Sequence, residues 1–447
     1  MAADVVPPPA GFAPEGTCTR SDVAPLGLSG LCLGMYAFLL PIQISIGSDL
    51  RLAPSDAFLL AYVLIRLSRF TTPRFAWSVW HAVILFSLSI GAVVTALQGD
   101  LSFYVVVQKG IGVLTLYLAY ASVVDFCRSL DRVVWLCQVF LWGVLLNLIV
   151  ALVALYGANA GLFDLSFVNF EGVRLAGFLV DPNAFGGLLA TAVALHFLPA
   201  AADVRLLPRN ASRVMSIALP VGLVLTFSRS AWIGAAGVIL TGAWLFGYPL
   251  VRNMAKLGGA FVVVLLVATA AVLPHADTLV KRGDQVESRF SILSQASEDF
   301  STNPITGIGL GESIERHGVQ IHNTTVAFLV ELGPFGLIAL IGLLSWFASH
   351  AFRISRSRDR IAHAIGGGLL AAHVGMFGVS LGIDAFYQRH WWLILGLIGA
   401  MVAIAEPARG PTAPHTPAFA HLTSTTLSRT IQTEESPTTR LPPCPTK

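Results

Sequence analysis

Three basic side chains stand in short polar segments between long apolar runs. Arg174 lies in VRLAGFLVDPNAFGG, Arg229 lies in TFSRSAWIG, and His322 opens HNTTVAFLV. Inside a membrane, an arginine is costly unless it faces a partner or a cavity. Guanidinium groups bind phosphate oxygens, and an imidazole titrates near neutral pH. These residue types favour a site for a phosphorylated ligand, although Arg229 could also be an interface arginine that reaches lipid headgroups.

Polar neighbours of these residues are candidates for the same site. Asp181 and Pro182 have the pattern of a helix N-cap followed by the first helical residue, and we interpret both as capping residues. A helix that starts there exposes free N–H groups, so Arg174 beside it predicts a phosphate site. Asn183 either caps this helix or binds the ligand. The remaining candidate substrate-binding residues next to the basic ones are Ser228 and Asn323.

Two further ionisable residues interrupt apolar sequence. Lys109 lies in VVVQKGIGV, where reaching the interface is favoured over binding a phosphate. Glu331 lies about two turns, or ~12 Å, inside the helix that Asn323 opens. A carboxylate at that depth needs a partner, either an arginine for structure or the ligand of the site. We keep Lys109 and Glu331 as candidate substrate-binding residues, and expect Asp384 and Arg389 to form an interface pair.

Two other patterns predict no additional chemistry. GIGLG, residues 307–311, resembles a phosphate-binding loop, but no strand precedes it and no Lys-Ser or Lys-Thr pair follows. We therefore expect turn glycines. His317 and His322 lie near Glu312 and Glu315, in a spacing that matches no zinc signature. The sequence thus predicts neither a metal nor a cofactor.

The elements that position these residues follow from the composition. The chain has 447 residues, of which 55% are hydrophobic and 12% are charged, and its mean hydropathy is +0.72. These values exclude a soluble globular enzyme, a disordered chain and a collagen-like fibre. The net charge of +3 does not indicate nucleic-acid binding, and the five cysteines contain no CxxC pair. The expected fold is an all-α polytopic membrane protein.

Apolar runs long enough to cross a bilayer predict about twelve transmembrane helices. They lie near residues 26–46, 52–68, 77–97, 103–124, 133–156, 181–199, 214–227, 230–248, 253–273, 323–349, 362–383 and 389–405. With the N-terminus in the cytoplasm, the cytoplasmic loops hold fourteen Lys and Arg residues and the short outer loops hold four. This asymmetry agrees with the positive-inside rule.

The domain organisation follows from the same pattern. Residues 1–25 are expected to be a disordered cytoplasmic N-terminal tail without a cleaved signal peptide. Residues 26–405 form the polytopic domain, with one long periplasmic loop at 274–322, and residues 406–447 form a disordered cytoplasmic tail.

On this topology four of the candidates reach the outer face of the membrane, although they span about 150 residues of sequence. They are Arg174, Asn183, Arg229 and His322. Two arginines and a histidine at the outer leaflet suit a diphosphate linked to a long lipid.

Three stretches resemble the O-antigen ligase and O-antigen polymerase superfamily. They are VRLAGFLVDPNAFGGLLA, LTFSRSAWIGAAGV, and NPITGIGLG with HNTTVAFLVELGPFGLIAL, which together cover about residues 170–345. The resemblance implies a GT-C-like fold in the bacterial inner membrane. It also implies a metal-independent, inverting transfer of a glycan from undecaprenyl diphosphate at the periplasmic face, in lipopolysaccharide or exopolysaccharide biosynthesis.

The resemblance also assigns roles and partners. Arg174 and Arg229 match the family arginines that hold the diphosphate, and His322 matches the essential loop histidine. The acceptor is a lipid A-core sugar in the ligases, another lipid-linked glycan in the polymerases, and a protein hydroxyl in related enzymes. The chain departs from the family pattern at Thr324, because an aromatic residue often follows soon after the His-Asn pair.

Two alternatives stay open. A transporter or lipid-carrier flippase would place charges at mid-membrane, for which Lys109 and Glu331 are the hints. A cell-wall glycan polymerase would depend on an acidic residue of the long loop, and the loop offers Asp277, Asp284 and Asp299.

Overall fold

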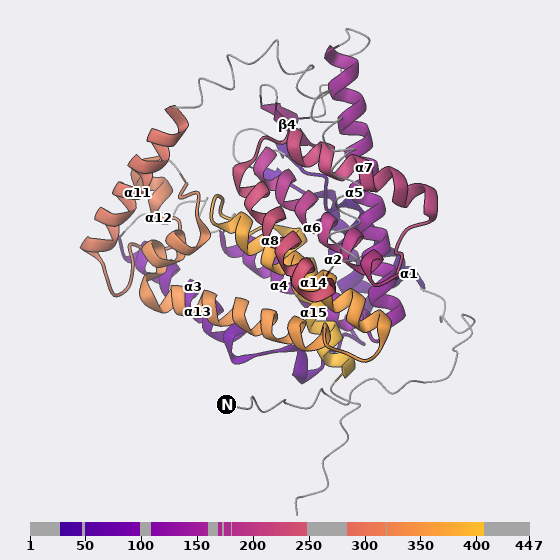
Figure 1. Cartoon of the computed structure of the whole chain (residues 1–447). Helices are drawn as coiled ribbons and strands as arrows, with labels where there is room; N and C mark the ends of the chain where they lie inside the picture. The colour runs from indigo at the N-terminus through magenta and orange to yellow at the C-terminus, as the bar shows by residue number, and fades with distance from the viewer. Residues whose placement is uncertain are drawn as a thin grey trace, which may run out of the picture. The chain divides into compact units, whose positions relative to one another are not determined.

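The computed structural model describes residues 27–46, 50–98, 109–159, 169–171, 174–179, 181–247, 284–318 and 320–405. These residues form α1 (Gly27–Leu39), α2 (Pro54–Arg66), α3 (Val79–Gln98), α4 (Gly112–Phe126), α5 (Leu130–Asn159), α6 (Pro182–Ala201), α7 (Arg209–Leu225), α8 (Arg229–Phe246), α11 (Asp284–Thr302), α12 (Glu312–His317), α13 (Thr324–Ile354), α14 (Arg360–Ser380) and α15 (Arg389–Ala405). A 3₁₀ turn covers Arg74–Ala76. Two short antiparallel pairs accompany the helices: β1 (Ile44–Ile46) with β2 (Leu50–Leu52), and β3 (Asn169–Glu171) with β4 (Arg174–Gly177). Figure 1 shows these elements.

Seven of these helices are long and apolar enough to cross a membrane: α3, α4 with the turn that begins at Lys109, α5, α6, α8, α13 and α14. The prediction of an all-α, multi-span membrane protein is therefore confirmed. Eleven of the twelve predicted spans coincide with a helix, but α1 and α2 have only 13 residues and α7 and α15 only 17. The remaining predicted span, 253–273, lies outside the described residues. The number of twelve spans therefore stays a prediction.

The predicted long loop contains helices over the part that the structure describes. α11 has 19 residues and α12 has 6, and α11 packs against α13. Residues 274–283 of this loop, and the predicted tails 1–25 and 406–447, lie outside the described residues.

Helices α6, α8 and α14 pack closely because small residues line their contacts. A Cβ atom added to Gly234 of α8 would lie 2.7 Å from the carbonyl oxygen of Gly375 of α14. A Cβ added to Gly186 of α6 would collide with the Cβ of Ala231 of α8. Such close backbone contacts are typical of helix association in membranes, where apolar burial gives little driving force.

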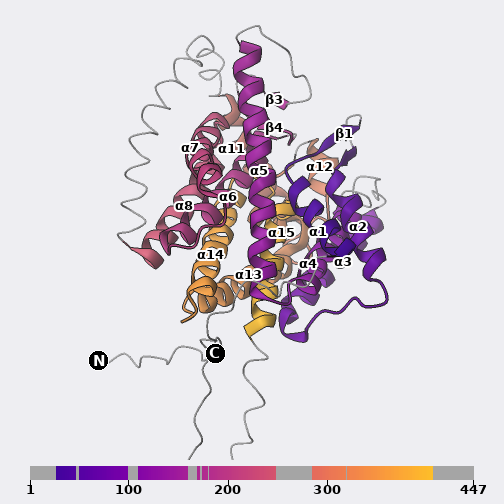
Figure 2. The ribbon, with the colours of Figure 1, turned by 90° about the vertical axis from the view of Figure 1, so that its right-hand side faces the viewer.

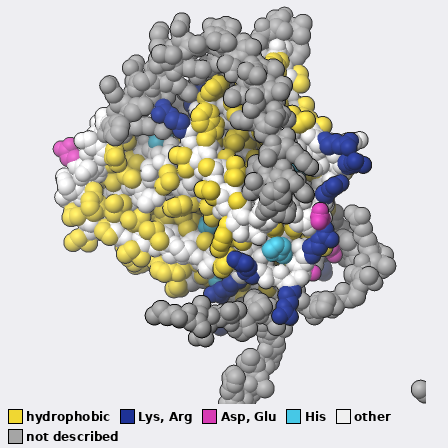
Figure 3. Space-filling view, in the orientation of Figure 1, with side chains coloured by type: hydrophobic (Ala, Val, Ile, Leu, Met, Phe, Trp, Pro, Cys, Tyr) yellow, Lys and Arg dark blue, Asp and Glu magenta, His cyan; other side chains and the backbone are white. Residues whose placement is uncertain are grey.

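The other helices pack in pairs around this group. α3 contacts α13, α4 contacts α15, and α1 contacts α2. Figure 2 shows the 30-residue helix α5 in front, with α1 on one side of it and α6 and α7 on the other, and it contacts all three. Exposed apolar side chains such as Leu240 and Trp244, 70% and 61% exposed, cover the outside of the helices. Figure 3 shows a broad hydrophobic area with Lys and Arg at its margins, as expected for a surface that faces lipid.

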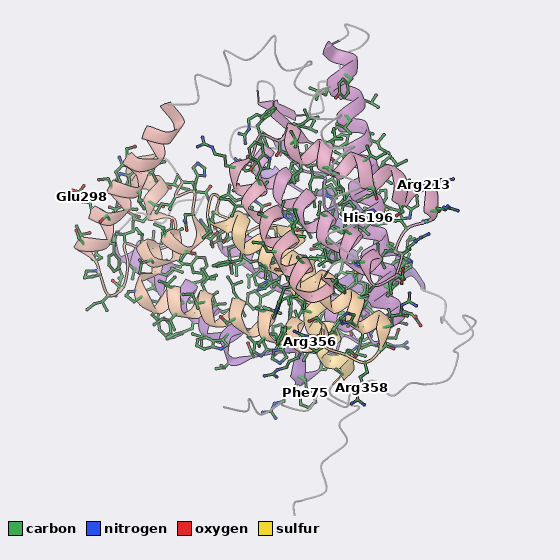
Figure 4. The ribbon with its side chains drawn as sticks, viewed as in Figure 1. Phe75, His196, Arg213, Glu298, Arg356 and Arg358 are labelled. Carbon is green, nitrogen blue, oxygen red and sulfur yellow. The ribbon has the colours of Figure 1, made fainter. Side chains whose placement is uncertain are left out.

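Two loops that are predicted to be cytoplasmic contact each other through an arginine. Arg360 donates hydrogen bonds to the carbonyl oxygens of Ala202 and Asp203, so the α13–α14 turn contacts the α6–α7 turn. The Arg356 guanidinium lies 5.4 Å from the ring centre of Trp244 near the end of α8. In Figure 4, Arg356 and Arg358 lie at the lower edge, whereas Glu298 of α11 lies at the left edge. The periplasmic position of the long loop stays a prediction.

Candidate active site

Arg174 is a buried arginine that joins two helix ends. It opens β4 and is 8% exposed. Its Nε donates to the carbonyl oxygen of Thr226 at 3.1 Å, and its Nη2 donates to Oδ1 of Asn183 at 2.7 Å. Thr226 caps the end of α7, and Asn183 lies in the first turn of α6. The guanidinium therefore fixes the end of α7 beside the start of α6.

The start of α6 has the geometry that the sequence predicts. Asp181 is the N-cap residue and accepts a hydrogen bond from the Asn183 backbone N–H at 2.8 Å, and Pro182 occupies the first helical turn. The Asn183 side chain donates a second bond to Asp181 at 3.0 Å and accepts the bond from Arg174. The capping roles of Asp181 and Pro182 are confirmed. Asn183 lies beside Arg174, and its role in binding stays a prediction.

Arg229 differs from Arg174 in its exposure. It is the first residue of α8, directly after the N-cap residue Ser228, whose Oγ accepts from the Ala231 N–H at 3.2 Å. The side chain of Arg229 is exposed. Among the described residues it has no hydrogen bond or ion pair. The guanidinium is therefore available to a ligand.

The turn before Arg229 has an unusual backbone. Phe227 has φ +47°, in the left-handed region, which is uncommon for a bulky residue. Ser230 Oγ lies 3.0 Å from Ser228 Oγ, and both hydroxyls are buried. Strained residues of this kind concentrate at functional sites. The turn thus holds Arg229 at the first position of α8 at a conformational cost.

His322 is one of the residues that line a pocket of about 160 Å³. Its side chain is exposed. The next residue, Asn323, is the N-cap of α13 and accepts from the Val326 N–H at 3.1 Å, while its Nδ2 donates to the carbonyl oxygen of Leu381 at 3.1 Å. The pocket is lined by Ile292, Leu293, Ile321, His322, Asn323, Val326, Leu381 and Gly382. It is a mainly apolar pocket whose lining includes an imidazole and an amide.

Contacts between helix ends connect the two arginines to the histidine segment. Gly186 of α6 packs against Ala231 and Ser228 at the start of α8. Gly382, after α14, packs against Ser230, since an added Cβ would lie 2.7 Å from the Ser230 Cβ. Because Gly382 also lines the pocket beside His322, the starts of α6, α8 and α13 meet around the end of α14. Helix starts present unpaired N–H groups and positive potential, which favour an anion.

Lys109 and Glu331 occupy a different environment from the one the sequence predicts. Lys109 is 4% exposed, and its Nζ lies 3.3 Å from Oδ2 of Asp384 and 3.7 Å from Oε2 of Glu331. Glu331 also accepts from the Gly311 N–H at 3.0 Å and from Ser313 Oγ at 2.6 Å. The expectation that Lys109 reaches the interface is therefore wrong, because two buried carboxylates hold it inside the protein. Substrate binding by Lys109 and Glu331 stays an untested prediction.

The expected pairing of Asp384 with Arg389 is also wrong. Arg389 instead forms a two-bond ion pair with Asp56 of α2, at 2.9 Å from Nε and 2.6 Å from Nη2. Asp384 faces Lys109. Both residues keep a partner, but each partner comes from a distant part of the sequence.

The glycine-rich segment is a turn structure that docks on a broken helix. Gly307, Gly309 and Gly311 all have positive φ, at +71°, +111° and +79°, which confirms the interpretation as turn glycines. Helix α13 is interrupted at Gly333, with φ +69°, and Pro334 follows. Pro334 has no N–H for the carbonyl of residue 330.

The glycine segment supplies the hydrogen bonds that the break removes. The Ile308 N–H donates to the carbonyl of Val330 at 2.9 Å, and the Gly309 N–H donates to the carbonyl of Glu331 at 3.0 Å. The break was not predicted, although the Gly333-Pro334 pair is a recognisable signal for it.

One family model matches the chain. It is described as O-antigen ligase and covers residues 214–341, from α7 through the first part of α13. This match confirms the resemblance to the O-antigen ligase and polymerase superfamily. The matched segment contains Arg229, His322, Asn323 and Glu331, whereas Arg174 and Asn183 precede it. No curated protein matches the chain.

Proposed function

We propose, from the O-antigen ligase segment at residues 214–341, that this multi-pass membrane protein transfers a glycan from an undecaprenyl-diphosphate carrier to a sugar acceptor. The family match supports glycan transfer of the O-antigen ligase or polymerase type in general. The carrier, an inner-membrane location with a periplasmic site, and a lipid A-core or glycan acceptor are our proposal. The alternative is a multi-span transporter or lipid-carrier flippase for polysaccharide export.

The observation that carries the proposal is the exposed guanidinium of Arg229 beside the starts of α6 and α8. A lipid diphosphate is a good leaving group, so the protein must mainly align the acceptor and stabilise the charge that develops on the bridging oxygen. Arginines do this by two parallel hydrogen bonds. In our proposal Arg229 contacts the diphosphate, and Arg174 shapes the same anion site through Asn183. Fixed guanidinium charge supplies this stabilisation without a metal.

In the proposed reaction the acceptor hydroxyl attacks the anomeric carbon from the side opposite the diphosphate. The new C–O bond forms as the bond to the diphosphate oxygen breaks, which inverts the anomeric configuration. The proton of the hydroxyl passes to His322; if His322 instead donates a hydrogen bond to the diphosphate, the proton passes to an oxygen of the departing diphosphate.

The test is complementation of the native host that lacks the gene, with surface polysaccharide separated on a gel. Arg229→Ala and His322→Ala are expected to reach the membrane at parental levels on a blot and to lose the polysaccharide or its attachment. Arg213→Ala is the matched control, since Arg213 is also exposed but lies near the start of α7, in a segment predicted to be cytoplasmic. Loss of long chains would indicate a polymerase, and loss of attachment would indicate a ligase.

Parental polysaccharide in both variants would contradict the proposed site and favour the transporter. A second measurement separates the two classes directly. Purified protein in detergent is incubated with the lipid extract of the deletion strain, which contains the unprocessed lipid-linked glycan. An enzyme of the proposed class releases the diphosphate lipid, whereas a transporter leaves the extract unchanged.

A further inference from the structure

The segment that carries His322 is held by the chain that follows α14. Asn323 Nδ2 donates to the carbonyl oxygen of Leu381 at 3.1 Å. Thr324 Oγ1 donates to the carbonyl of Ile383 at 3.1 Å and accepts from the Ala385 N–H at 2.8 Å. These bonds attach the start of α13 to the chain between residues 381 and 385.

The carboxylate of Asp384 lies between the two flanks of His322. Its Oδ2 accepts from Nε2 of Gln320 at 3.0 Å, and its Oδ1 lies 3.5 Å from Thr324 Oγ1. Gln320 is two residues before His322, and Thr324 is two residues after it. A single carboxylate, 9% exposed, therefore contacts the chain on both sides of the histidine.

Lys109 links this carboxylate to the glycine segment. Its Nζ lies 3.3 Å from Asp384 and 3.7 Å from Glu331. Glu331 in turn accepts the bonds from Gly311 and Ser313. Buried charges are stable only when they are paired and hydrogen-bonded. The three charged groups thus form one buried network that joins α4, α13, the long loop and the chain after α14.

We propose that Asp384, held in place by Lys109, is a positioning residue for His322. The carboxylate fixes Gln320 and Thr324, and these fix the imidazole between them in the lining of the pocket. The inference rests on the proposed function, because it assigns Asp384 a role in the same site. Catalytic groups must be held within fractions of an ångström, and a displacement of about 1 Å can cost about 10²-fold in rate.

The test compares steady-state kinetics of purified full-length variants with the lipid extract of the deletion strain as the donor. Asp384→Asn keeps the shape of the side chain and leaves Lys109 paired with Glu331. We expect it to lower kcat at least about tenfold, with the KM for donor within about twofold. Thr324→Val removes the hydroxyl and is expected to have the same effect, whereas Thr324→Ser retains the hydroxyl and should restore most of kcat.

Asp56→Asn is the matched control. It breaks the ion pair between α2 and Arg389, five residues after Asp384, so it perturbs the same stretch of chain without touching the His322 segment. Parental kcat in Asp384→Asn, with His322→Ala inactive, would overturn the inference and leave the proposed function intact. A raised KM with parental kcat would also overturn it, since it would make Asp384 a substrate ligand.

Two further results also bear on the inference. If His322→Ala has parental activity, the proposed site fails and the inference fails with it. If Asp384→Asn does not fold, the inference is tested by comparing kcat of Thr324→Val with kcat of Thr324→Ser. Valine and serine with equal kcat would then overturn the inference, and a kcat that depends on the hydroxyl would support it.

Discussion

Arg174 and Arg229 of the candidate site differ in their exposure and in their hydrogen bonds. Arg174 donates two hydrogen bonds inside the protein, to Thr226 and Asn183. Arg229 is exposed and makes none among the described residues. Both arginines are assigned to the same anion site, so both alanine variants should lose activity. Only the Arg174 variant should also lose stability.

The size of the difference follows from the bonds. A hydrogen bond to a charged group contributes about 1.5–3 kcal/mol, so two such bonds correspond to about 3–6 kcal/mol. A loss of about 3 kcal/mol lowers the ratio of folded to unfolded protein about 10²-fold. An exposed side chain without partners changes stability by about 0.5 kcal/mol or less. For activity, the loss of one fixed donor to a developing anion costs about 10²–10³ in rate.

The assay combines turnover of the lipid extract with thermal unfolding of the purified variants in detergent. Arg229→Ala is expected to melt with the parent protein and to lose turnover, whereas Arg174→Ala is expected to melt earlier and to lose turnover. Equal melting of the two variants would refute the assignment of Arg174 as the buried member of the pair. Early melting of Arg229→Ala would show that Arg229 has a structural partner, contrary to its exposure and its lack of bonds among the described residues.

Three further predictions concern the glycines and metal ions. Gly307→Ala should loosen the glycine segment, because an added Cβ would lie 2.5 Å from a carbonyl carbon of α13 at a positive φ. Limited proteolysis of the loop should then be faster than in Gly318→Ala, where the φ is also positive but nothing lies within 4 Å. Gly234→Ala should lower the melting temperature more than Gly237→Ala, because the nearest atoms of α14 would lie 2.6 Å and 3.5 Å away, respectively. Finally, EDTA should leave turnover of the lipid extract unchanged, and restoration of lost activity by a divalent cation would contradict the proposed role of the arginines.

The sequence predicts much of this structure for physical reasons that are visible in particular residues. Hydrophobic runs determine where helices form in a bilayer, so the described helices outside the predicted long loop coincide with predicted spans. Asp181 and Pro182 act within one helical turn, so their role could be read locally. Arg229 and His322 stood out because charges between apolar runs are rare.

The partners of the buried charges could not be predicted in the same way. Lys109 and Asp384 are 275 residues apart, and only the packing of α4 against α15 and of α13 beside them brings the two together. The sequence shows that each charge needs a partner but does not show which one. Arg389 illustrates the same point, because its partner Asp56 is 333 residues away.

The docking of the glycine segment has a consequence for the order in which the chain assembles. The N–H of Leu310 donates to the carbonyl of Gly91 in α3, and Thr95 and Gln98 donate to carbonyls 215 and 210 residues later in the sequence. During synthesis, more than two hundred further residues must therefore be made before the C-terminal end of α3 can form these bonds. The broken helix α13 must also be present, because its carbonyl groups at Val330 and Glu331 accept hydrogen bonds from the same segment. Closure of the region around His322 is thus among the last steps of biogenesis, and a chain cut short before α13 would insert many of its helices but never assemble the site.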